Sequence, residues 1–129
     1  MRWRVRKKPT TLSLSPTGLV QSRASLINKY PLFFRYLDFG IECYDGWLWL
    51  LDELIGKIVC IDPLASASQI KEKYGTLRVY MMSTTDEIED LIEEYEVLSE
   101  TVCELCGSPG KINDDGWISV RCDTCRKNN

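Results

Sequence analysis

The chain has 129 residues, of which 44% are apolar and 27% are charged. This length accommodates one hydrophobic core, and the composition is that of a globular protein, which excludes a wholly disordered chain. The longest central apolar run, Trp47–Leu51, is far shorter than the roughly 20 residues of a membrane-spanning helix. Residues 9–20 lack the apolar region of a secretory signal, so we expect a cytoplasmic protein without a membrane partner.

Charge is distributed unevenly along the sequence. Eight basic residues and no acid lie between Met1 and Leu37, which leaves eight basic residues against 19 acids in the remainder. Between Arg78 and Lys111 there are nine acids and no basic residue. The acidic body would repel a phosphate backbone, whereas the basic N-terminal end would attract one.

The first part of the chain shows no hydrophobic periodicity. Residues 1–21 mix basic residues with Pro, Ser, Thr and Gly, and we interpret them as a basic flexible arm, either a disordered tail or a docking arm. From Ser22 to Leu37 the apolar residues recur at helical spacing around Pro31, which predicts two short helices. Residues 22–100 are expected to form an α+β core.

A longer helix and a β segment are predicted next. Asp45 can cap a helix that runs to about Val59, and the broad apolar face of that helix predicts burial. Residues 62–68 are expected to form a loop. Residues 69–82 then alternate in the manner of β structure, and Gly75 marks a bulge or a turn within them.

The residues after the β segment predict a third helix. Thr84 and Glu87 form a capping-box pattern. Apolar residues then repeat at spacings of three and four, which is typical of a helix that buries one face. These residues are Ile88, Leu91, Ile92, Tyr95 and Leu98. The outer face carries the acids, and those in the first turn interact favourably with the helix dipole.

The strongest chemical signal lies near the C-terminal end, in two CxxC pairs separated by fifteen residues. The pairs are Cys103 with Cys106 and Cys122 with Cys125. This spacing is typical of a four-cysteine zinc ribbon or of a related treble-clef site. Each pair can form a tight knuckle that directs two thiolates to one point, with Gly107 free to adopt positive φ. A redox-active disulfide is less favoured, because no βαβ pattern accompanies the motif.

A hairpin between the pairs would bring them together. Residues 111–113 and 117–121 are strand-like, and the Asp-Gly signal of a tight turn lies between them. Zinc with four thiolates carries a double negative charge, which nearby basic residues can offset, namely Lys111, Arg121, Arg126 and Lys127. Four protein ligands leave no coordination position for water. We therefore expect structural, non-catalytic Zn²⁺ in a ribbon-like module of residues 101–129 packed on the core.

The remaining residues give little basis for catalysis. Cys43 and Cys60 stand alone, and we interpret them as buried free thiols rather than as a second metal site or a nucleophile. The chain has no histidine, which excludes Ser-His-Asp and Cys-His catalysis. It also has no phosphate-binding loop and no GxGxxG motif. The sequence therefore favours a non-enzymatic protein, and no catalytic residue is assigned.

One basic and aromatic cluster lies within the folded body. Its members are Lys71, Lys73, Tyr74, Arg78 and Tyr80. Such a cluster could hold a phosphate, a nucleotide or an acidic partner. The alternative is an exposed strand face whose charges protect an edge from aggregation.

Three stretches of the chain are distinctive: FGIECYDGW at residues 39–47, IKEKYGTLRVY at residues 70–80, and CELCG at residues 103–107 followed by Cys122 and Asp123. They resemble a group of short phage and prophage proteins without an assigned activity. The resemblance spans about residues 26–125 and excludes the basic arm, and some of those proteins end the metal motif with His instead of Cys. The resemblance implies a phage protein in the bacterial cytoplasm and indicates no specific function.

Three functional classes follow from these observations. The favoured one is a non-enzymatic, zinc-binding interaction protein of phage type that binds a host or phage protein, for example one of a bacterial defence system. The first alternative is a nucleic-acid-associated zinc-ribbon factor that uses the basic arm. The second is a protein that binds or converts a small nucleotide on the Lys71 to Tyr80 cluster. The sequence does not determine the oligomeric state.

Overall fold

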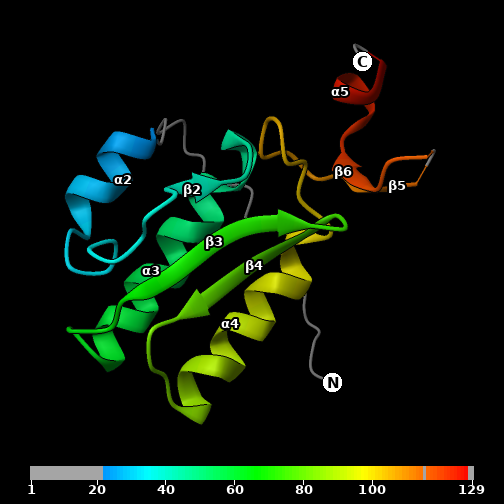
Figure 1. Ribbon diagram of the computed structural model, residues 1–129. Helices are drawn as coiled ribbons and strands as arrows, with labels where there is room; N and C mark the ends of the chain where they lie inside the picture. The colour runs from blue at the N-terminus through cyan, green and yellow to red at the C-terminus, as the bar shows by residue number, and fades with distance from the viewer. Residues whose placement is uncertain (1–21, 115, 128–129) are drawn as a thin grey trace.

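The computed structural model describes residues 22–114 and 116–127, and the expected basic arm lies outside them. The elements of the body are α2 (Arg23–Lys29), β2 (Ile41–Glu42), the 3₁₀ helix η1 (Asp45–Trp47), α3 (Leu48–Ile61), β3 (Ala67–Lys73), β4 (Thr76–Met81) and α4 (Asp86–Ser99). The C-terminal elements are β5 (Lys111–Asn113), β6 (Ser119–Arg121) and α5 (Asp123–Lys127). Figure 1 shows β5, β6 and α5 at one end of the body.

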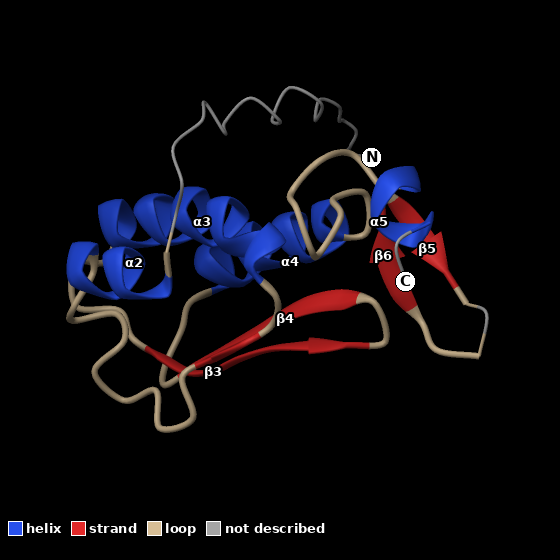
Figure 2. Cartoon of the chain, turned by 90° about the horizontal axis from the view of Figure 1, so that it is seen from above, coloured by secondary structure: helices blue, strands red, loops and turns tan. Residues whose placement is uncertain are grey.

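The body has two layers, which confirms the predicted α+β class. Its sheet has the order β2-β3-β4, with β2 parallel and β4 antiparallel to β3. Helices α2, α3 and α4 all lie on one side of this sheet (Figure 2). In the described part of the chain, no helix is long and apolar enough to cross a membrane.

The core lies between the helices and the inner face of the sheet. The long helix α3 buries Leu48, Leu50, Leu51, Leu54, Ile55 and Ile58. Helix α4 buries Ile88, Ile92 and Tyr95, and the sheet contributes Ile70, Leu77 and Val79. The spacing of three and four along each helix places these side chains on one stripe, so the predicted apolar faces do form the core.

The β3–β4 hairpin turns at Tyr74 and Gly75. Both residues have positive φ, 54° and 80°, which a two-residue turn between twisted strands requires. The Glu72 carboxylate accepts a hydrogen bond from the Gly75 amide at 2.8 Å. Gly75 therefore marks the turn, and the irregularity of the ladder lies at the other end of β3, between Ala67 and Gln69.

Helix α4 also covers the open edge of the sheet. Strand β4 is an edge strand, and its outward amides are bound by side chains of α4: Ser99 Oγ accepts from Leu77 at 2.9 Å. Glu96 Oε2 accepts from the Val79 amide at 3.1 Å. Burial raises the pKa of Glu96, and the hydrogen bond from Val79 opposes that shift. These contacts satisfy backbone groups that would otherwise be open to strand pairing with another chain.

Two expectations near the N-terminal side of the body are wrong. The second short helix is absent, because Pro31 follows α2 and the chain continues as turns over residues 31–36. Asp45 does not cap the long helix, since α3 is entered through η1 and its N-cap residue, Trp47, makes no side-chain cap bond. The Asp45 carboxylate instead pairs with Arg23 at 3.1 Å.

Two element boundaries also differ from the predictions. The N-cap of α4 is Thr85, whose hydroxyl accepts from the Ile88 amide at 3.3 Å, so the expected cap at Thr84 is displaced by one residue. Strand β6 begins at Ser119, not at Trp117, because residues 116–118 belong to the loop before it. Boundaries of this kind depend on details of the loop that no periodic pattern encodes.

Candidate metal centre

The first cysteine pair forms a knuckle. The Cys103 carbonyl accepts from the Gly107 amide at 2.9 Å, and the Cys103 amide donates to the Ser108 carbonyl at 2.7 Å. Gly107 has a φ of 86°, as the sequence predicted, and a Cβ there would lie 3.0 Å from Trp49 Nε1. This turn is closed by hydrogen bonds and directs the two thiols to the same side.

The second pair lies at the start of a helix. Strands β5 and β6 form the predicted hairpin, with Lys111 paired to Arg121, and Cys122 follows β6 directly. Cys125 lies in α5, and its amide donates to Cys122 Sγ at 3.4 Å. The expectation of a second knuckle is therefore wrong, because the second pair lies at the start of a helix that follows the hairpin.

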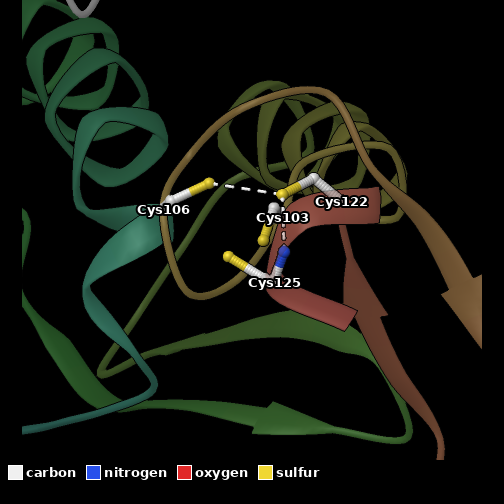
Figure 3. Close-up of side chains that lie close together, drawn as sticks. All are labelled: Cys103, Cys106, Cys122 and Cys125. Atoms are coloured by element: carbon white, nitrogen blue, oxygen red, sulfur yellow. Dashed lines mark hydrogen bonds between the residues drawn. The ribbon is translucent and has the colours of Figure 1, made fainter. Parts of the chain in front are cut away.

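All four sulfur atoms converge on one point (Figure 3). The ligand atoms of Cys103, Cys106, Cys122 and Cys125 all lie within 4.8 Å of one another. The Sγ atoms of Cys106 and Cys122 are 3.7 Å apart, and no disulfide joins any two of the four cysteines. A tetrahedron with Zn–S bonds of about 2.3 Å has S···S distances of about 3.8 Å. The four cysteines are thus spaced to hold one metal ion of this size.

The electrostatics of the cluster also fit a bound cation. Burial raises the pKa of Cys103, and hydrogen bonding with Cys122 raises the pKa of Cys125 to about 12. Burial opposes ionisation of Cys106 too, but hydrogen bonds from Ser108 and the neighbouring cysteines outweigh it and lower its pKa to about 7. Four adjacent sulfurs cannot all be thiolates without a positive charge among them, and a divalent cation supplies it.

The basic residues near the cluster have partners of their own. Arg121 Nε lies 3.3 Å from Glu104 Oε2, and the Glu104 side chain is only 4% exposed. Burial raises the pKa of Glu104, and Arg121 opposes that shift. Arg126 lies 4.0 Å from Asp123 in α5. Arg121 therefore stabilises a buried carboxylate in the first knuckle, a role that the sequence did not indicate.

Three hydrogen bonds attach the first knuckle to the start of α3. The Gly46 amide donates to the Glu104 carbonyl at 2.8 Å, and the indole of Trp47 donates to the Val102 carbonyl at 2.8 Å. Trp49 Nε1 donates to the Gly107 carbonyl at 3.2 Å. A Cβ at Gly46 would lie 2.2 Å from the Cys103 carbonyl oxygen, so only glycine fits this contact. We call these contacts the knuckle seam.

The sequence analysis missed this seam. The sequence signal was the unusual Gly-Trp-Leu-Trp run at residues 46–49, which carries two indole donors beside a glycine. Periodicity assigns Trp47 to an apolar helix face and indicates no acceptor for either indole. The indole N–H groups need acceptors when buried, and that requirement points to a backbone packed against them.

The basic and aromatic cluster falls on the β3–β4 hairpin. Lys71 faces Arg78 across the two strands, and Tyr80 faces Gln69. Lys73 and Tyr74 lie at the turn, where Lys73 Nζ is 5.8 Å from the Tyr74 ring centroid. The structure thus gathers Lys71, Arg78 and Tyr80 on neighbouring positions and leaves Tyr74 at the tip.

The two isolated cysteines differ in exposure. Cys43 is partly buried, and burial raises its pKa to about 12, which disfavours the thiolate. Cys60 is exposed near the end of α3, so the expectation of a buried thiol is wrong for this residue. Its position faces away from the stripe of α3 that packs in the core.

Comparison with known proteins adds no further assignment. No protein-family model, no curated protein and no solved structure matches the chain. The metal centre therefore rests on the spacing of its four sulfur atoms.

Proposed function

We propose that the chain is a non-enzymatic protein-binding module that a structural Zn²⁺ stabilises. The observation that carries the metal assignment is the convergence of four sulfur atoms within 4.8 Å. Four thiolates complete the tetrahedral coordination of zinc, so the site offers no position for a substrate or an activated water. The residues that would hold the ion are Cys103, Cys106, Cys122 and Cys125.

The knuckle seam supports a structural role for the ion. The same knuckle that carries Cys103 and Cys106 supplies the carbonyls that bind Gly46, Trp47 and Trp49. Its backbone is therefore engaged in attaching residues 101–127 to the body. A short segment with β5, β6 and α5 has few apolar residues of its own to bury, and zinc supplies the missing stability.

Zinc stoichiometry of the purified protein tests the metal assignment. We expect one zinc per chain by elemental analysis, and loss of that zinc in Cys122→Ser. Cys60→Ser is the matched control, because Cys60 is an exposed cysteine outside the cluster. A wild-type protein without stoichiometric zinc, or a Cys122→Ser protein that retains it, would contradict the proposal.

The partner is proposed to be a protein of a phage-infected bacterial cell, in the cytoplasm. The support is the sequence resemblance to phage and prophage proteins and the acidic body, which disfavours a nucleic acid. Affinity capture from bacterial lysate, with zinc-loaded wild type as bait, tests it. One stoichiometric protein that elutes with the wild-type bait and not from resin without bait would support the proposal, and its absence would count against it.

A nucleic-acid-associated function is the second candidate, because of one hollow beside the metal cluster. The hollow has a volume of about 640 Å³, and Arg121, Arg126 and Lys127 line it together with Trp117. Trp117 is 75% exposed, and an exposed indole beside cations can stack on a base. Retention of single-stranded DNA that decreases steeply with salt and is lost in Trp117→Ala would favour this candidate.

A further inference from the structure

The outer face of the sheet differs in charge from the rest of the body. We use this name for the side opposite Ile70, Leu77 and Val79. Alternation along the strands places Lys71, Lys73, Arg78, Tyr80 and Gln69 on it, with the acid Glu42 of β2 beside Lys71. The helices lie on the other side of the sheet (Figure 2). Beyond Leu37 the chain has 19 acids and eight basic residues, and three of those eight lie on this face.

Lys71 and Arg78 are direct neighbours across β3 and β4. Opposed side chains on neighbouring strands have Cβ atoms only about 5 Å apart, so two like charges in this position repel and destabilise the sheet. Within the described residues, neither Lys71, Lys73 nor Arg78 forms an ion pair. The nearest acid in register is Glu42, beside Lys71, and its carboxylate accepts from Gln69 at 3.2 Å.

Arg78 has a further unsatisfied group. Its Nε is buried and has no hydrogen-bond partner in the described structure. The Glu96 carboxylate of α4 is near enough for the Arg78 guanidinium to oppose the rise of its pKa, but no acceptor reaches Nε itself. A fixed cation beside a second cation favours an anion that neutralises both and accepts hydrogen bonds from them.

The aromatic neighbours suit a peptide more than a lone anion. Tyr80 is 43% exposed and Tyr74 is 69% exposed, so the face offers apolar area beside its charges. Exposed tyrosines supply contact area at low entropic cost and are enriched where proteins bind proteins. A nucleic acid would meet only three cations here and then the repulsion of an acidic body, whereas stable phosphate-backbone binding uses a longer run of contacts.

We propose that the outer face, through Lys71, Arg78 and Tyr80, binds an acidic peptide segment of a protein partner. The carboxylates of that segment contact Lys71 and Arg78, and an apolar or aromatic residue packs on Tyr80. This inference rests on the proposed function, because it names the chemistry of the partner. The like charges that weaken the free sheet become favourable in the complex, since the bound carboxylates separate them.

Fluorescence anisotropy with a labelled peptide of alternating Glu and Tyr tests the proposal in the full-length, zinc-loaded chain. We expect salt-sensitive binding that falls at least about tenfold in Lys71→Gln/Arg78→Gln, in line with two charge-assisted hydrogen bonds. The matched control is Arg4→Gln/Arg6→Gln, which removes the same charge from the basic N-terminal end and should change the affinity less than about threefold. A peptide with Gln in place of Glu should not bind.

Several outcomes would overturn the proposal. They are no binding of the Glu-Tyr peptide, equal loss in both double variants, loss in the N-terminal variant alone, or tighter binding of single-stranded DNA that depends on Lys71 and Arg78. If the double variant does not fold, Lys71→Gln alone keeps the packing of Arg78 and should still weaken binding about threefold. A partner captured equally by wild type and by the outer-face variants would refute this face as the site and leave the proposed function intact.

Discussion

The body and the C-terminal module are stabilised by different physics. The body packs helices α2, α3 and α4 against one side of a sheet, with twelve large side chains that include Trp47 and Leu54 less than 2% exposed. Residues 103–127 contribute few core side chains, chiefly Val120, and their elements are three to five residues long. Hydrophobic burial can maintain the body, whereas the module depends on its metal cluster and on the knuckle seam.

Removal of the metal should produce the largest difference between the two regions. We expect chelation, or Cys103→Ser, to unfold residues 103–127, because structural zinc contributes apparent free energy of about 10–16 kcal/mol. Helices α2, α3 and α4 should remain, so far-ultraviolet circular dichroism should keep most of its helical signal. Hydrogen exchange resolved by residue measures both regions in one experiment. Equal protection of β6 with and without zinc would contradict this prediction.

A cavity in the core should destabilise the body and leave the zinc content unchanged. Leu54 is fully buried in α3, and Leu54→Ala should lower the free energy of unfolding of the body by about 2–5 kcal/mol. The cluster is built from residues after Val102, so the zinc content should stay at one per chain below the melting temperature. Thermal melts with zinc analysis measure both quantities. Loss of zinc in the folded Leu54→Ala protein would show that the two regions are not separable.

The knuckle seam should couple the two regions. In Gly46→Ala the added Cβ would lie 2.2 Å from the Cys103 carbonyl oxygen, so the knuckle or the start of α3 must move. We expect a loss of about 1–3 kcal/mol, as for other overpacked sites, together with a red shift of the Trp47 fluorescence. Ser83→Ala, at an exposed loop position, is the control. An unchanged melting temperature in Gly46→Ala would show that the knuckle seam does not couple the two regions.

The smallest expected effect concerns pH and the covered sheet edge. Burial raises the pKa of Glu96 above that of the unfolded chain, so the folded state binds the proton more tightly. The ionised carboxylate therefore costs stability above the raised pKa, and that cost disappears as the pH falls through it. Glu96→Gln should remove this part of the pH dependence while an amide oxygen still accepts from Val79. Denaturation at several pH values measures this dependence in both proteins. The same pH dependence of the free energy of unfolding in wild type and in Glu96→Gln would contradict the role given to Glu96.

Local patterns in the sequence determined a large part of this protein. The two CxxC pairs, the Asp-Gly hairpin between them and Gly107 define the metal module, because ligand spacing and positive φ are local properties. The spacing of Ile88, Ile92 and Tyr95 likewise defined the buried face of α4. Alternation in residues 69–82 predicted β structure with a bulge or a turn at Gly75, and it placed Lys71 and Arg78 in that structure.

Only the tertiary structure decided how these parts meet. No local pattern shows that the Trp47 indole binds the Val102 carbonyl, 55 residues away, or that Glu96 and Ser99 of α4 cover the amides of β4. Spacing encodes which side chains share a face, whereas the partner of each buried donor is fixed by the packing of the whole chain.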